Sequence, residues 1–240
     1  MNTIKESIWL ARFDFRYVVK HIPVVLLLAA LYGFFFSGIM EGYLGTVQPA
    51  FDLFFFLYLF FMPAWSRSKD SLARRIGGDL YAAPVFLLLN QLPIKRSVII
   101  TSRFICLYVP ITIGTVGVMI MTYYFSDAFK EILNVRYLIV LTMFWTGIAL
   151  SSCSASVTME MGDRISKKRF ITSFIWLVGG AAALYFLMKD VLQTGILKWS
   201  IFFSADHPVL MVLMAIVIPT LSTWWAYRHA LKQMNKMDYM

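Results

Sequence analysis

The sequence predicts an all-α membrane protein with six transmembrane helices and with both termini in the cytoplasm. Hydrophobic residues fill 60% of the 240 positions, and the mean hydropathy is +0.71. The apolar residues are gathered in blocks long enough to cross a bilayer, and most charges lie between the blocks. A water-soluble domain of this length has too little interior to bury so much apolar surface. We therefore expect one transmembrane domain over residues 1–240.

The number of spans follows from block length. A helix rises about 1.5 Å per residue, so about 20 apolar residues cross a hydrocarbon core of roughly 30 Å. Six blocks approach that length: Ile22–Met40, Thr46–Trp65, Phe104–Phe125, Tyr137–Val157, Phe170–Met188 and Pro208–Tyr227. The apolar stretch Leu80–Leu92 is shorter and contains Pro84 and Asn90. We expect it to be a cytoplasmic docking helix or a re-entrant segment rather than a seventh span.

Lysine and arginine residues set the orientation. Four lie in residues 1–21, seven in 66–103, four in 158–169 and three in the C-terminal tail, whereas the alternate loops hold four. Because Lys and Arg are retained on the cytoplasmic side, this split of 18 to 4 places both termini and the 66–103 segment there.

Two stretches outside the blocks are amphipathic. Residues 1–21 place apolar side chains at helical spacing with basic residues on another side, which predicts an interfacial helix or a plain juxtamembrane helix. The external stretch Asp190–Asp206 predicts either a short helical hairpin or a loop with Trp199 in the interfacial belt.

Residues suited to catalysis are scarce. No HExxH, GxSxG or phosphate-loop motif occurs, and the two cysteines show no metal-ligand spacing, so we expect no metal site and no disulfide. Asp52 is the one acidic residue inside an apolar block, and we interpret it as solvated at the external end of span two. We expect single substitutions of Asp52, Glu160 and Asp163 to be tolerated.

Small residues favour close approach of helices. They occur as Gly179–Ala183 in span five and as the serine-rich run 151–156 in span four. The serines either pack helices together or line a polar pathway: Ser151, Ser152, Ser154 and Ser156.

A short motif in the 66–103 segment carries a family resemblance. The run Gln91–Arg103 resembles the "leucine-proline-(Val/Ile)-x-Arg" stretch, followed by a basic residue that opens span three, of ABC-2 type transporter permeases. The matching residues are Leu92, Pro93, Ile94, Arg96 and Arg103. About thirteen residues carry the motif, while the six-span layout extends the resemblance over the whole chain.

The resemblance implies a permease subunit that pairs with a second copy or a paralogue and sits on two separate ATPase subunits. ATP and magnesium would bind those partners, and this chain would need no cofactor. The coupling contacts would come from a helix over 84–92 that ends at Pro93, with apolar anchors and a basic rim: Leu88, Leu89, Leu92, Pro93, Ile94, Lys95 and Arg96. A role of Lys95 and Arg96 as simple positive-inside anchors stays open.

Among compact members of this family, the chain is similar to bacterial exporters of amphipathic peptides, such as the phenol-soluble modulin exporters. The expected function is therefore export of amphipathic peptides or other hydrophobic compounds across the bacterial cytoplasmic membrane. Two alternatives stay open, namely a membrane-embedded protease-like enzyme and a non-transporting immunity or sensor protein. The scarcity of paired buried acids or histidines argues against the enzyme.

Overall fold

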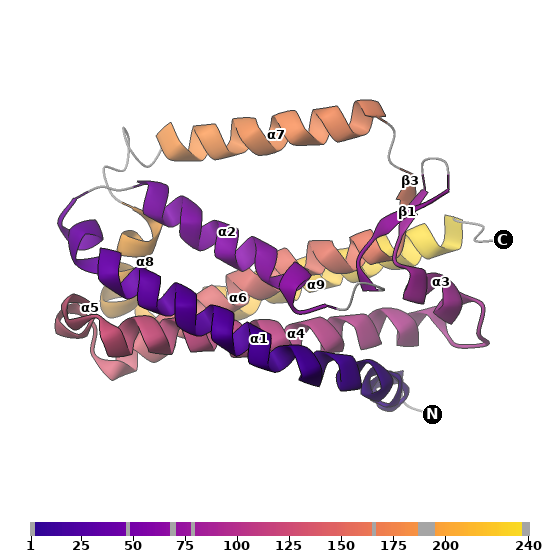
Figure 1. The fold of residues 1–240 in the computed structure, drawn as a ribbon, viewed down its shortest axis with the longest axis horizontal. Coiled ribbons are helices and arrows are strands. Elements are labelled where there is room, and N and C mark those ends of the chain that lie inside the picture. Colours follow the sequence, from indigo (N-terminus) through magenta and orange to yellow (C-terminus); the bar gives the residue numbers. More distant parts are fainter. Residues whose placement is uncertain are drawn as a thin grey trace.

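Six long helices form most of the molecule. The computed structural model describes residues 3–46, 49–67, 71–77, 80–164, 167–186 and 195–236. The long helices are α1 (Thr3–Gly45), α2 (Pro49–Trp65), α4 (Arg96–Phe125), α6 (Val135–Glu160), α7 (Lys167–Phe186) and α9 (Pro208–Lys236). They run along the long axis of the molecule (Figure 1). The helical fold class is confirmed, since 89% of the structure is helical.

The short elements lie at the two ends of these helices. Three short helices are α3 (Pro84–Asn90), α5 (Asp127–Ile132) and α8 (Ile196–Asp206). Three strands are β1 (Arg74–Gly77), β2 (Leu80–Ala82) and β3 (Asp163–Arg164). Both described ends of the chain, the strands and α3 lie at one end of the molecule, while α5 and α8 lie at the other (Figure 1). The elements that share an end are those that the charge distribution assigns to one side of the membrane.

The strands form a small antiparallel sheet in the order β1-β2-β3, which the sequence analysis did not predict. Arg74 pairs with Ala82, and Leu80 pairs with Arg164. The stretch Leu80–Leu92 is therefore a strand followed by a helix, instead of one helical segment. The turn-forming run Gly77-Gly78-Asp79 between two β-prone stretches is the sequence signal for such a hairpin.

Within the part of the chain that the structure describes, four helices are long and apolar enough to cross a membrane: α1 from Val18, α4, α6 and α9. Helices α2 and α7 occupy the two remaining predicted blocks, but their apolar stretches fall short of the same length. A multi-pass membrane protein is thus supported, and the count of six spans stays a prediction. The end of the fifth predicted block, at Met188, lies outside the described residues.

The predicted interfacial segment 1–21 is helical from Thr3 and continues into the first apolar block as a single helix, α1. Part of its surface is buried against the protein instead of lying in the membrane interface. Ser7, Leu10, Ala11 and Val18 are buried, and the Cys106 thiol of α4 donates to the Ala11 carbonyl oxygen over 3.8 Å. Apolar side chains on the outward side, among them Trp9 and Phe13, are exposed.

The core lies between the long helices and is rich in aromatic rings. Trp145 of α6 is buried against Phe55 of α2 in an edge-to-face contact, and its indole N–H donates to Ser200 of α8 over 3.1 Å. Large apolar side chains are also exposed along all six long helices. Exposed apolar surface on every side is expected where lipid is the solvent.

Two glycines allow close approach of helices. A Cβ on Gly33 of α1 would lie 2.5 Å from Cβ of Met121 on α4, and a Cβ on Gly147 of α6 would lie 2.7 Å from the Ala215 carbonyl oxygen on α9. Around Gly179 and Gly180 of α7, no atom of the described residues lies within 4 Å of such a Cβ. These two glycines of the small-residue run in span five therefore make no close packing contact with the described part of the chain.

Candidate functional site

The predicted coupling residues form an exposed surface at the strand end of the molecule. Leu88 is 64% exposed and Leu92 is 50% exposed, and Lys95 and Arg96 are exposed beside them. We call these four residues the α3 surface. It combines two apolar side chains with two cations, which suits a partner that has an apolar groove with an acidic edge.

The other predicted coupling residues are placed differently. Leu89 and Ile94 pack against the protein's own core, so they are not free anchors for a partner. Helix α3 ends at Asn90 with Gln91 as its C-cap, so it stops before Pro93. The predicted helix over 84–92, ended by Pro93, was therefore two residues too long.

Helix α3 is held to α6 at its start. The Ala83 N–H, directly before α3, donates to the main-chain oxygen of Glu160 over 3.0 Å. Phe86 is fully buried under α3. Beyond α3, the Arg96 guanidinium at the start of α4 donates to the Asn235 side-chain oxygen on α9. A displacement of α3 therefore acts directly on the end of α6, whereas the bond to α9 belongs to α4.

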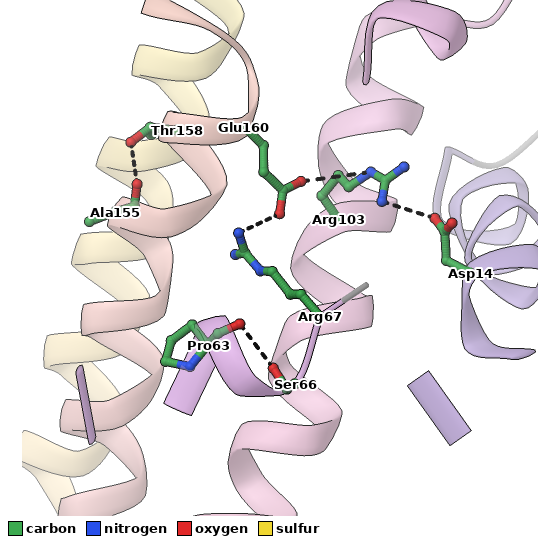
Figure 2. Close-up of polar contacts among 8 residues, drawn as sticks. All are labelled: Asp14, Pro63, Ser66, Arg67, Arg103, Ala155, Thr158 and Glu160. Carbon is green, nitrogen blue, oxygen red and sulfur yellow. Dashed lines mark hydrogen bonds and ion pairs between the residues drawn. The ribbon is translucent and has the colours of Figure 1, made fainter. Parts of the chain in front are cut away.

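Four charged side chains from four separate segments meet beneath α3 and the sheet (Figure 2). Arg67 Nη1 lies 2.8 Å from Glu160 Oε1, and Arg103 Nη1 lies 3.1 Å from Asp14 Oδ2. Arg103 Nε lies 3.9 Å from Glu160 Oε2, so Glu160 stands between the two arginines. We call Asp14, Arg67, Arg103 and Glu160 the charge cluster.

The charge cluster is largely withdrawn from solvent. The exposed fractions of its side chains are 2% for Glu160, 3% for Arg103, 7% for Arg67 and 23% for Asp14. Two carboxylates face two guanidinium groups, so the formal charges balance. Burial of charges is costly unless each has a partner, and here each cation lies against at least one anion.

Hydrogen bonding in the charge cluster is incomplete among the described residues. Nε and Nη2 of both arginines and Oε2 of Glu160 are buried and have no hydrogen-bond partner there. A buried ionic cluster with unfilled donors contributes little net stability compared with apolar residues of the same volume. Stability alone is therefore a weak reason for these four residues.

A small cavity adjoins the charge cluster. Its volume is about 30 Å³, and its lining includes all four charged residues together with Cys106. Cys106 lies one helical turn beyond Arg103 on α4 and is buried. The thiol of Cys106 is thus a natural reporter of access to the charge cluster.

Local structure places each member of the charge cluster. Gly162, with φ of 94°, follows the end of α6, so Glu160 is the last helical residue before the chain turns into β3. Arg67 follows the end of α2, where the Ser66 N–H and hydroxyl donate to Met62 and Pro63 carbonyl oxygens (Figure 2). Arg103 lies in the first turns of α4.

The charge cluster was not predicted from the sequence, where Arg67 counted only as a positive-inside residue and Arg103 as such a residue and as part of the family motif. The available signal was that all four members lie near block ends assigned to the same side of the membrane. The expectation that Glu160 tolerates substitution loses its basis, since a change there would leave the buried Arg67 without the carboxylate it is paired with.

The serine run of α6 contains hydrogen bonds to its own helix. Ser151, Ser152 and Ser154 donate to carbonyl oxygens four residues earlier. The Ser154 hydroxyl also lies 3.1 Å from the Tyr108 hydroxyl of α4, which in turn bonds Thr223 of α9. These bonds tie α4, α6 and α9 together, as helix packing requires, and a pathway role for Ser151–Ser156 stays a prediction.

Asp52 is buried, so the interpretation of a solvated residue was wrong. Its Oδ1 accepts hydrogen bonds from the Tyr43 hydroxyl and from the Leu197 N–H, both at 2.8 Å. Leu197 is in the first turn of α8, where main-chain N–H groups lack helical partners. Asp52 therefore caps α8 from a distant helix. The external stretch Asp190–Asp206 was predicted to be a helical hairpin or a loop; its described part contains the helix α8, and residues 190–194 lie outside the described residues.

Comparisons with known proteins identify no relative. No protein-family model matches the chain, no curated protein is similar to it, and no solved structure matches its fold. Over the described residues, no group of three or more His, Cys, Asp or Glu side chains is arranged to hold a metal ion.

Proposed function

We propose that this chain is the permease subunit of an ATP-driven exporter of the ABC-2 type, powered by separate ATPase subunits. The observation that carries the proposal is the α3 surface, two exposed leucines with two exposed cations on and beside a short helix whose start is hydrogen-bonded to α6. In a transport subunit, a partner that binds such a surface moves it. The contacts between this surface and the long helices then transmit the movement to the transmembrane helices.

Further features favour the same function. Long apolar helices provide a membrane domain, and the residues expected on the cytoplasmic side gather at one end of it (Figure 1). All side chains of α7 that the structure describes are exposed in a single copy, which suits a pairing with a second permease copy or a paralogue. We propose amphipathic peptides or other hydrophobic compounds as the exported class, on the resemblance alone.

Co-purification tests the proposed function. The chain should be co-expressed with the products of the genes that adjoin its own, extracted into lipid nanodiscs and assayed for a bound ATPase and for ATP hydrolysis. We expect a stable complex whose hydrolysis rate changes when the permease is present. Absence of a complex together with an unchanged hydrolysis rate would refute a permease role.

Substitutions on the α3 surface locate the contact. We expect Leu92→Ala to weaken ATPase binding by about tenfold, because truncating a packed apolar anchor costs more than removing a rim charge. Lys95→Ala should have a smaller effect that grows at low salt. Leu221→Ala is the matched control, since Leu221 is an equally exposed leucine on the predicted lipid-facing side of α9.

Thiol labelling separates docking from a re-entrant structure. Leu88→Cys and Leu92→Cys should react with an aqueous thiol reagent in the free permease and become protected when the ATPase binds. Protection in the absence of the ATPase would instead place this segment in the membrane.

A further inference from the structure

We propose that Glu160 is a positioning residue that couples the position of α3 to the charge cluster, and through it to the ends of α1, α2, α4 and α6. The coupling is a property of this chain. Its use in transmitting ATPase movement to the spans rests on the proposed function.

Glu160 makes contacts in two directions. Its main-chain oxygen accepts the hydrogen bond from Ala83 at the start of α3, and β2 pairs with β3 directly beyond it. Its side chain forms an ion pair with Arg67 and faces Arg103. Arg103 in turn forms an ion pair with Asp14 of α1. A movement of α3 therefore displaces Glu160, which is paired with Arg67 and faces Arg103.

The energetics of the charge cluster suit an element with two arrangements. Arg67 is paired with Glu160, Arg103 is paired with Asp14 and faces Glu160, and several buried donors have no hydrogen-bond partner among the described residues. A displacement of Glu160 weakens its attraction to both arginines, because the Coulomb energy falls with distance and is large where the dielectric constant is low. The partly exposed Asp14 gives the opened charge cluster a path to solvent.

The native cysteines provide the measurement. Cys106 lines the cavity beside the charge cluster, whereas Cys153, two helical turns before Glu160 on α6, is fully buried and does not line that cavity. Opening of the charge cluster should raise the alkylation rate of Cys106 and leave that of Cys153 unchanged. Global unfolding would raise both rates, so mass spectrometry of the two cysteine peptides distinguishes the two events.

Two substitutions remove the two contacts of Glu160, one made by its side chain and the other by its main-chain oxygen. Glu160→Gln removes the charge and keeps the shape of the side chain. Ala83→Pro removes the N–H that donates to Glu160, and the φ of −78° and ψ of 129° at Ala83 suit proline. Asp127→Asn is the matched carboxyl-to-amide control, since Asp127 is paired with Lys130 in an exposed ion pair at the opposite end of the molecule.

The experiment is a double-mutant cycle on the permease chain alone in nanodiscs, with iodoacetamide as the probe. We expect Glu160→Gln to raise the Cys106 alkylation rate by about tenfold or more, because one partner of a buried ion pair is lost. Ala83→Pro should also raise the rate, and the double variant should fall well short of the product of the single effects.

Three results would overturn the proposal: single effects that multiply in the double variant, no effect of Ala83→Pro, or an effect of Asp127→Asn as large as that of Glu160→Gln. If Glu160→Gln does not fold, Arg67→Gln breaks the same ion pair from its other side and takes its place in the cycle. Because no ATPase is present, failure of this cycle is distinct from failure of the proposed function.

Discussion

The close contact between α6 and α9 at Gly147 leads to a prediction about stability. A Cβ at this position would lie 2.7 Å from the carbonyl oxygen of Ala215 and 3.2 Å from its Cα. Both atoms belong to the backbone of α9, so a rotamer change cannot relieve the overlap. Gly147→Ala should therefore force α6 and α9 apart near the middle of α6.

The magnitude follows from two opposing effects. Overpacking of a tight contact costs about 1–3 kcal/mol. Replacement of a helical glycine by alanine gains about 1 kcal/mol in helix propensity. Gly38→Ala on α1 has the same gain without the clash, because nothing lies within 4 Å of its Cβ position. The difference between the two variants therefore isolates the clash, at about 1–3 kcal/mol.

Unfolding in mixed micelles by titration with SDS, followed by circular dichroism, measures this difference. We expect Gly147→Ala to unfold at a lower SDS fraction than the wild type and Gly38→Ala to unfold at the same or a higher fraction. Equal midpoints for the two variants would show that α6 and α9 do not approach each other as closely as the structure indicates.

Two further substitutions test polar contacts between helices. Asp52→Ala should cost about 1–3 kcal/mol of stability, because the Tyr43 hydroxyl and the Leu197 N–H lose their shared acceptor. The rate of amide hydrogen exchange should then rise at the start of α8 but not in α5. Unchanged exchange in α8 would contradict the capping role. Tyr108→Phe should cost about 1 kcal/mol, because the hydroxyls of Ser154 and Thr223 lose their common partner, whereas Tyr124→Phe, at an exposed site on the same helix, should leave the SDS midpoint unchanged.

The fold was largely predictable from the sequence because lipid imposes a simple requirement on the chain. A segment in the hydrocarbon region must bond its own backbone groups and present apolar side chains, so length and hydropathy alone mark the long helices. Six apolar blocks were predicted, and a long helix occupies each of them. The sheet was missed because its strands are short, and strand pairing depends on residues such as Leu80 and Arg164 that lie far apart in the chain.

The sequence by itself determined the helical class of the protein, the approximate positions of the helices and which charged segments gather at one end of the molecule. Only the tertiary structure decided which charges meet. Arg67 and Arg103 are equivalent to other basic residues when counted along the chain, yet they are buried against Glu160 and Asp14 because helix packing brings four segment ends together. Likewise, Asp52 caps α8 across 145 positions of sequence. Such contacts depend on the relative placement of helices, which hydropathy does not encode, because lipid-facing and protein-facing surfaces are equally apolar.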